Sequence, residues 1–220
     1  MSDTPGVPAL PVLSAPEVRV LGVLVEKALS TPDVYPLSLN ALVAGCNQKS
    51  NREPVVAFDE GDVEAALVRL VGRRLAAEQT GMGTRVPKYR ALVGGVYELT
   101  SAEKAVLAEL LLRGPQTAGE LRGRCERMHA FASVDDVQAA LDTLAGRDPA
   151  LVVAIAGRRE PRWAHRLAGD VAGDVPEAAP ASGAATASTT VGALTAEVDA
   201  LRARVEALEA AFDAFRRQFD

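Results

Sequence analysis

The stretch Asp62-Val-Glu-Ala-Ala-Leu-Val-Arg-Leu70 decides the fold, because it recurs 74 residues later as Asp136-Val-Gln-Ala-Ala-Leu-Asp-Thr-Leu144. The same offset relates Tyr89 to Trp163 further along the chain. Self-similarity at a fixed offset is the sequence signature of duplicated structural units. We therefore predict two units of the same fold, with a helix at this position in each.

The start of each unit carries a helix-capping signal. Ser14-Ala-Pro-Glu17 and Thr100-Ser-Ala-Glu103 share the Ser/Thr-x-x-Glu form, in which the hydroxyl and the carboxylate bind free amides at a helix start. Apolar residues at helical spacing follow both signals. A second helix is expected after Ser38 in the first unit and after Thr117 in the second, which gives three helices in each.

Two short strands are predicted to close each unit. They span 75–80 and 85–92 in the first unit, and 151–155 and 162–167 in the second. A helix-turn-helix followed by a β-hairpin is the winged-helix plan. The predicted fold is mainly α with small β-hairpins (α+β), as two tandem winged-helix domains that pack together and share apolar surface.

The predicted domain boundaries follow from this pattern. They are a disordered N-terminus at 1–13, winged-helix domain 1 at 14–95, winged-helix domain 2 at 96–168, a flexible linker at 169–190 and a coiled-coil helix at 191–220. The linker is rich in Ala, Gly, Ser, Thr and Pro, as flexible linkers are.

The last 30 residues repeat apolar side chains at alternating spacings of three and four. Valine at position a and leucine at position d of the heptad favour parallel dimers. We predict a homodimer through a C-terminal coiled coil. The alternative is a helix that folds back onto its own domains, which three bulky Phe side chains near the end make credible. The candidate dimer seam is Leu194, Val198, Leu201, Val205, Leu208 and Phe212.

No pattern of catalytic or metal-binding residues stands out. The only two cysteines, Cys46 and Cys125, occupy matching repeat positions and are expected to be buried structural thiols. The chain has two His, no CxxC and no phosphate-binding glycine loop. We predict a non-enzymatic protein with no cofactor and no metal. The N-terminal residues lack a signal peptide or membrane span, so a cytoplasmic location is expected.

The run Cys46-Asn-Gln-Lys-Ser-Asn-Arg-Glu-Pro54 resembles the signature of the YceH family of bacterial proteins. Tyr35-Pro-Leu-Ser38 and Leu111-Leu-Arg-Gly114 look like the same family, and the match covers about 14–167. The resemblance implies a tandem winged-helix fold with a coiled-coil tail. It implies no particular activity.

This run is expected to form the turn between the second and third helices, and it allows two interpretations. In the first, Lys49 and Arg52 contact phosphates while Asn47, Gln48 and Asn51 reach base edges. In the second, the amide side chains satisfy backbone groups in an irregular loop. The residues alone leave both open.

Cations of this turn and of the two hairpins make duplex DNA the first expected partner, bound mainly through phosphate contacts. The expected function is that of a DNA-binding, transcription-regulator-like protein that acts as a dimer. The candidate DNA contacts are Lys49, Arg52, Arg85, Lys88, Arg90, Arg158, Arg159, Arg162 and Arg166.

The charge distribution supports an alternative, a protein-interaction scaffold without DNA binding. Residues 1–168 carry 20 Lys and Arg against 20 Asp and Glu, and residues 169–220 carry 4 against 9. A DNA-binding domain is usually basic. The third helices, which would enter the major groove, begin with acidic residues in both units.

Overall fold

The first half of the chain folds into three helices and a small sheet. The computed structural model describes residues 10–79, 86–157 and 160–169. In chain order the first half contains α1 (Ala15–Ser30), a short 3-10 helix (Pro32–Val34), β1 (Leu37–Ser38), α2 (Leu39–Cys46), α3 (Glu60–Gly72), β2 (Ala76–Gln79) and β3 (Lys88–Ala91).

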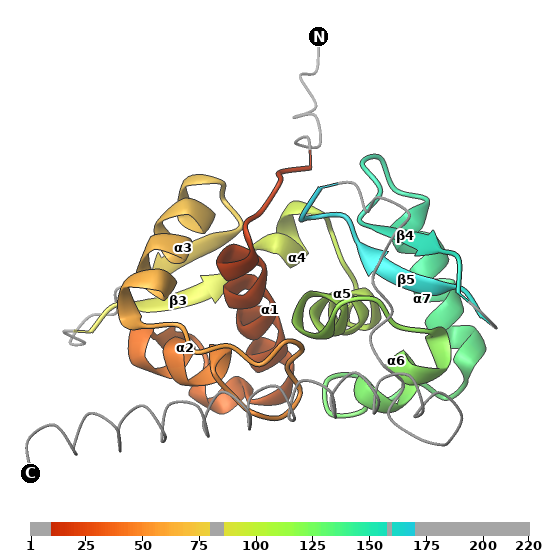
Figure 1. Cartoon of the computed structure of the whole chain (residues 1–220), viewed down its shortest axis with the longest axis horizontal. Helices are drawn as coiled ribbons and strands as arrows, with labels where there is room; N and C mark the ends of the chain where they lie inside the picture. Colours follow the sequence, from red (N-terminus) through yellow and green to blue (C-terminus); the bar gives the residue numbers. More distant parts are fainter. Residues whose placement is uncertain (1–9, 80–85, 158–159, 170–220) are drawn as a thin grey trace, which may run out of the picture. The chain divides into compact units, whose positions relative to one another are not determined.

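The second half repeats this order after a short helix. Its elements are α4 (Val93–Val96), α5 (Ser101–Arg113), α6 (Ala118–Arg124), α7 (Val134–Ala145), β4 (Val152–Ile155) and β5 (Arg162–His165) (Figure 1). The structure is therefore a mixed α+β fold of helices and small antiparallel sheets, as predicted.

The capping signals begin helices in both halves. The backbone N–H of Ser14 donates to Glu17 Oε2 at 2.9 Å, and that of Thr100 donates to Glu103 Oε2 at 2.8 Å. The Thr100 hydroxyl accepts from the backbone N–H of Glu103 in return. These bonds satisfy amides that have no partner within the helix.

The sheets differ between the halves by one short strand. The first sheet has the order β1-β3-β2, and its Leu37 pairs with Tyr89. The second sheet has β4 and β5, and Gln116 forms an isolated bridge to Trp163 where the first half has β1. The sequence did not predict β1, because a two-residue strand has no detectable alternation.

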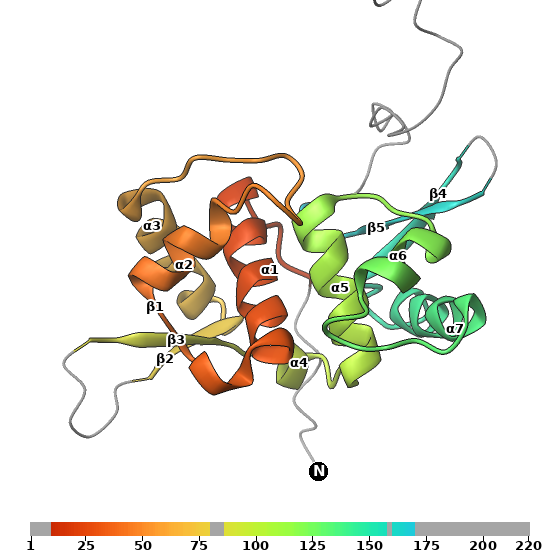
Figure 2. The ribbon, with the colours of Figure 1, turned by 90° about the horizontal axis from the view of Figure 1, so that it is seen from below.

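Helices α1 and α5 lie side by side at the junction of the two halves (Figures 1 and 2). A Cβ atom on Gly22 of α1 would lie only 2.9 Å from Leu112 Cδ2 of α5. One cluster of buried apolar side chains runs through both halves. The predicted sharing of apolar surface is confirmed, and it explains why α1 is buried on nearly all sides.

The described end of the N-terminal segment is ordered, in contrast to the prediction of a disordered 1–13. Leu13 is 3% exposed, and its backbone N–H donates to Leu167 O at 2.6 Å. It is therefore part of the core. Apart from Gly169, the predicted linker lies outside the described residues, as do the coiled-coil helix and its seam residues.

Candidate functional site

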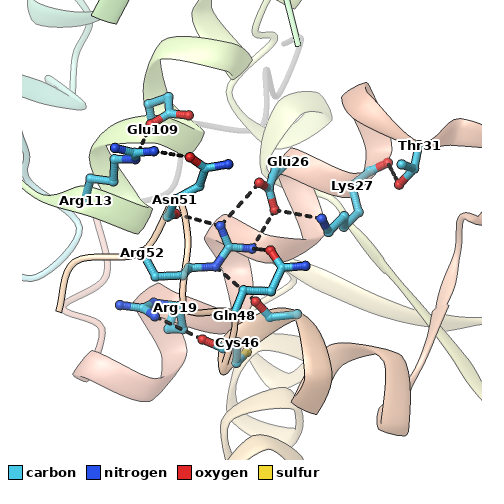
Figure 3. Close-up of polar contacts among 11 residues, drawn as sticks. Arg19, Glu26, Lys27, Thr31, Cys46, Gln48, Asn51, Arg52, Glu109 and Arg113 are labelled. Atoms are coloured by element: carbon cyan, nitrogen blue, oxygen red, sulfur yellow. Dashed lines mark hydrogen bonds and ion pairs between the residues drawn. The ribbon is translucent and has the colours of Figure 1, made fainter. Parts of the chain in front are cut away.

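The turn at 46–54, here called the signature turn, places Arg52 inside the protein. Its side chain is fully buried against the Glu26 carboxylate of α1, with Nη2 at 2.7 Å from Oε2 and Nη1 at 3.2 Å from Oε1 (Figure 3). Its Nε also donates to Gly45 O at 3.0 Å. A buried guanidinium needs such a full set of acceptors.

Arg52 is therefore buried in an ion pair, whereas the sequence predicted an exposed side chain that contacts phosphate. The prediction was wrong because the polar run looks like an exposed loop, while the partner carboxylate of Arg52 lies on another helix. Lys49 of the same turn is exposed, as predicted.

The amide side chains of the signature turn serve the fold. Asn47 forms two bonds with Phe58, donating from Nδ2 to the carbonyl at 2.7 Å and accepting from the N–H at 2.8 Å. Gln48 Oε1 accepts from Arg52 Nη2 at 2.9 Å. These contacts support the structural interpretation of Asn47 and Gln48.

The signature turn also joins the two halves. The N–H of Glu53 donates to Leu112 O at 2.9 Å, and Asn51 Oδ1 accepts from Arg113 (Figure 3). Arg113 Nε in turn lies 3.3 Å from Glu109 Oε2 within α5. The run that carries the family resemblance thus fixes the turn of the first half to α5 of the second.

Glu109, which is bound by Arg113 at the contact between the two halves, is a buried carboxyl with a raised pKa. It is 4% exposed. Burial raises its pKa to about 7, while Arg113 and Arg124 lower it and Glu26 adds to the rise. Desolvation of the charged form outweighs the nearby cations.

Replacing Glu109 with Gln should flatten the dependence of stability on pH. A carboxyl with pKa 4.5 unfolded and about 7 folded stabilises the protein at low pH, and this contribution is lost as pH rises through 7. Between pH 5 and 8 the free energy of unfolding of Glu109→Gln should gain about 2 kcal/mol relative to the wild type.

Urea unfolding of both proteins at each pH measures this difference. Burial lowers the pKa of His165 to about 4, so His165 opposes Glu109 by losing stability as pH falls from 6.5. Both proteins keep His165, so its effect cancels in the comparison. Parallel pH profiles for wild type and variant would show that Glu109 does not titrate in this range.

An ion pair that the sequence analysis did not predict occurs in both halves. Arg73 Nε lies 3.6 Å from Glu17 Oε1, and Arg147 Nη2 lies 3.1 Å from Glu103 Oε1. Each pair joins the capping glutamate of the first helix to the end of the third helix. Arg73 and Arg147 are related by the same offset as the repeated stretch, so the sequence contained the signal.

The predicted phosphate contacts of the hairpins fall into three groups. Lys88 and Arg90 are exposed on β3. Arg162 donates to Pro115 O at 2.8 Å and pairs with Glu120 at 3.1 Å, while Arg166 is half-buried and has a partner. Outside the described residues lie Arg85, Arg158 and Arg159. Among the described residues, Lys88 and Arg90 are therefore the two hairpin cations that are exposed and form no ion pair.

The third helices begin with acids that cap them. Asp59 and Asp62 bind each other's backbone N–H groups at the start of α3, and Ser133 and Asp136 do so at the start of α7. Capping explains these acids without a ligand. Their negative charge remains at the helix start, where a binding partner would meet it.

One face of α3 presents a stripe of exposed residues that capping does not explain. It consists of Glu60, Glu64, Val68 and Val71, here called the α3 stripe. The spacing of four, four and three residues places them on one side of the helix. Val68 is 67% exposed and Val71 is 37% exposed. At the position of Val68 the second repeat has Asp142.

The predicted structural role of the cysteines agrees with their burial. Cys46 and Cys125 are both free and fully buried. Burial raises the pKa of Cys46 to about 11 and that of Cys125 further still. Such thiols are unreactive. Within 10–79, 86–157 and 160–169, no group of His, Cys, Asp or Glu could hold a metal ion.

Comparison with known sequences gives a family match over most of the chain. The family described as "Protein of unknown function, DUF480" matches residues 13–165. A UPF0502 protein of Geobacter sulfurreducens is 52% identical over 157 residues, which cover 70% of this chain and 71% of that protein. A UPF0502 protein of Koribacter versatilis is 50% identical over 71% of this chain and 74% of its own length.

A third relative extends the match further. A UPF0502 protein of Burkholderia pseudomallei is 48% identical over 190 residues, covering 84% of this chain and 79% of its own length. None of the described helices is long and apolar enough to cross a membrane.

Proposed function

We propose that this chain, a member of the DUF480 family, is a non-enzymatic adaptor. It binds a partner protein through the α3 stripe. We further infer that its two halves are tandem winged-helix domains, that the resembling YceH family is this same family, and that residues 191–220 pair two chains.

The single observation that carries the proposal is the chemistry of the α3 stripe. In a DNA-binding winged helix, the third helix enters the major groove with its N-terminal residues against the bases. Here that helix presents Glu60 and Glu64 at its start and exposed valines further on. Carboxylates repel phosphates, and exposed Val68 offers an apolar contact to a protein.

The repeat strengthens this interpretation. In α7 of the second half, Gln138 and Asp142 occupy the positions that Glu64 and Val68 occupy in α3. Gln138 Nε2 donates to Asp142 Oδ1 at 2.8 Å. An exposed valine in one copy and a solvated aspartate in the other distinguish the two helices. The expected partner is a segment with basic and apolar side chains, since these complement the α3 stripe.

The cations of α3 do not offset its acidity. Arg69 and Arg73, at the end of α3, lie 3.7 and 3.6 Å from the buried Glu17 carboxylate, so each already has an anionic partner. The exposed start of α3 therefore stays acidic. This arrangement favours a basic partner over a nucleic acid.

Val68→Asp should weaken binding of a labelled amphipathic helical peptide of Leu and Lys by about tenfold. The substitution gives α3 the residue that the second repeat already has, so the fold should tolerate it. Val134→Asp is the matched control, because Val134 is an exposed valine at the start of α7. Fluorescence anisotropy of the peptide against the full chain measures both affinities. Equal losses in the two variants would remove α3 as the docking site.

DNA binding is the second candidate function, favoured by exposed Lys88 and Arg90 on β3. A labelled duplex titrated with the full chain from 50 to 250 mM salt separates the candidates. Binding that weakens steeply with salt and is lost in Lys88→Gln/Arg90→Gln would support DNA. The adaptor proposal predicts no duplex binding at physiological salt.

A further inference from the structure

A polar groove of about 430 Å³ lies where the two halves meet. The end of α1, the signature turn, α5 and the region around the end of α6 all contribute to its lining. Lys27, Gln48, Asn51 and Glu109 of this lining are drawn in Figure 3. We call it the inter-repeat groove. Its volume is within the range of small-molecule sites.

Four cations from three segments line the inter-repeat groove, namely Lys27, Lys49, Arg124 and Arg127. Lys49 and Arg127 are exposed and have no anionic partner among the described residues. Lys27 Nζ lies 3.4 Å from Glu26 Oε2, and Arg124 lies 3.7 Å from Glu120 Oε1. Two of the four charges are thus uncommitted.

The two carboxylates of the groove, Glu26 and Glu109, are fewer than its four cations, and each also has a cationic partner outside the lining. Glu26 is bound by Arg52 at 2.7 Å, and Glu109 lies 3.3 Å from Arg113. Neither Arg52 nor Arg113 is part of the groove lining, so each adds positive charge beside the groove beyond that of the lining cations. The surface that faces the cavity is left with excess positive charge.

We infer that the inter-repeat groove binds a small anion that carries phosphate groups. Phosphate oxygens accept several charge-assisted hydrogen bonds at once, which suits Lys and Arg side chains arriving from different segments. The cations surround one cavity and do not form an extended row, so a small molecule fits better than a duplex backbone. Amide groups of Gln48 and Asn51 add polar contacts at the wall.

The groove is well placed to sense such a ligand. Its lining includes Asn51, whose side chain bonds Arg113 across the junction of the halves. A bound anion would contact the signature turn on one side and Arg127 on the other. It would therefore stabilise the folded protein by linking the two halves.

Pyrophosphate is the probe for this site, in isothermal titration and thermal unfolding of the full chain at constant ionic strength. Wild type should bind saturably and gain thermal stability. Lys49→Gln/Arg127→Gln should lose at least about tenfold in affinity. Lys88→Gln/Arg90→Gln is the matched control, because it removes the same charge from exposed β3 residues outside the groove, and it should lose less than about twofold.

Three results would overturn the inference. They are absence of pyrophosphate binding to the wild type at millimolar concentration, equal losses in both double variants, and displacement of pyrophosphate by a short DNA duplex. Displacement by a duplex would mean that the groove cations bind a nucleic-acid backbone. None of them bears on the α3 stripe, because the peptide experiment uses a different helix and different variants.

Discussion

Replacing Arg52 with Met should lower the free energy of unfolding by about 3–5 kcal/mol, the cost typical of removing one partner of a buried ion pair. The methionine leaves the Glu26 carboxylate without its bidentate partner. It also removes the donor to Gly45 O. Urea unfolding of the full chain followed by circular dichroism measures the loss.

The double variant Glu26→Leu/Arg52→Met is the control that assigns the loss to the buried charge. Replacing a buried ion pair by apolar residues of similar size is often close to neutral. We expect the double variant to regain part of the stability and not all, since Gly45 O stays without its donor. A loss below about 1 kcal/mol in Arg52→Met would mean that the side chain is solvated and free for phosphate.

Gly22→Leu should destabilise the protein by about 3 kcal/mol, the upper end of what overpacking a core usually costs. Even a Cβ atom at this position would meet Leu112 Cδ2 at 2.9 Å and Leu111 Cβ at 3.1 Å. The larger side chain would push α1 away from α5 and open the shared core.

Gly123→Leu on α6 provides the comparison, because nothing lies within 4 Å of a Cβ there. It should be neutral or slightly stabilising, since leucine favours helix more than glycine by up to about 1 kcal/mol. Equal urea midpoints for Gly22→Leu and wild type would contradict the close packing of α1 on α5.

Local signals made the helices predictable. Ser14 and Thr100 each begin a helix through the Glu three residues later, as the capping pattern indicates. The offset between Tyr89 and Trp163 also placed a strand correctly in each half. These features depend on neighbouring residues or on the internal repeat, so they can be predicted from a single sequence.

Long-range pairing was not predictable in the same way. Arg52 and Glu26 are 26 residues apart, and no local pattern marks them as partners. The contact between Asn51 and Arg113 joins different repeats, so self-similarity within the chain could not reveal it. The sequence did show acids at the start of the third helices. The exposure of Val68 could have been inferred from the repeat, because the equivalent position there holds the polar residue Asp142.

The most direct test of the adaptor proposal is a two-dimensional NMR titration of the isotope-labelled full chain with the Leu and Lys peptide. We predict that backbone amide shifts change along 60–72 and stay constant in α7, whose matching face lacks an exposed valine in its middle. Shifts confined to β2 and β3, or to α7, would contradict the assignment of the α3 stripe as the docking surface.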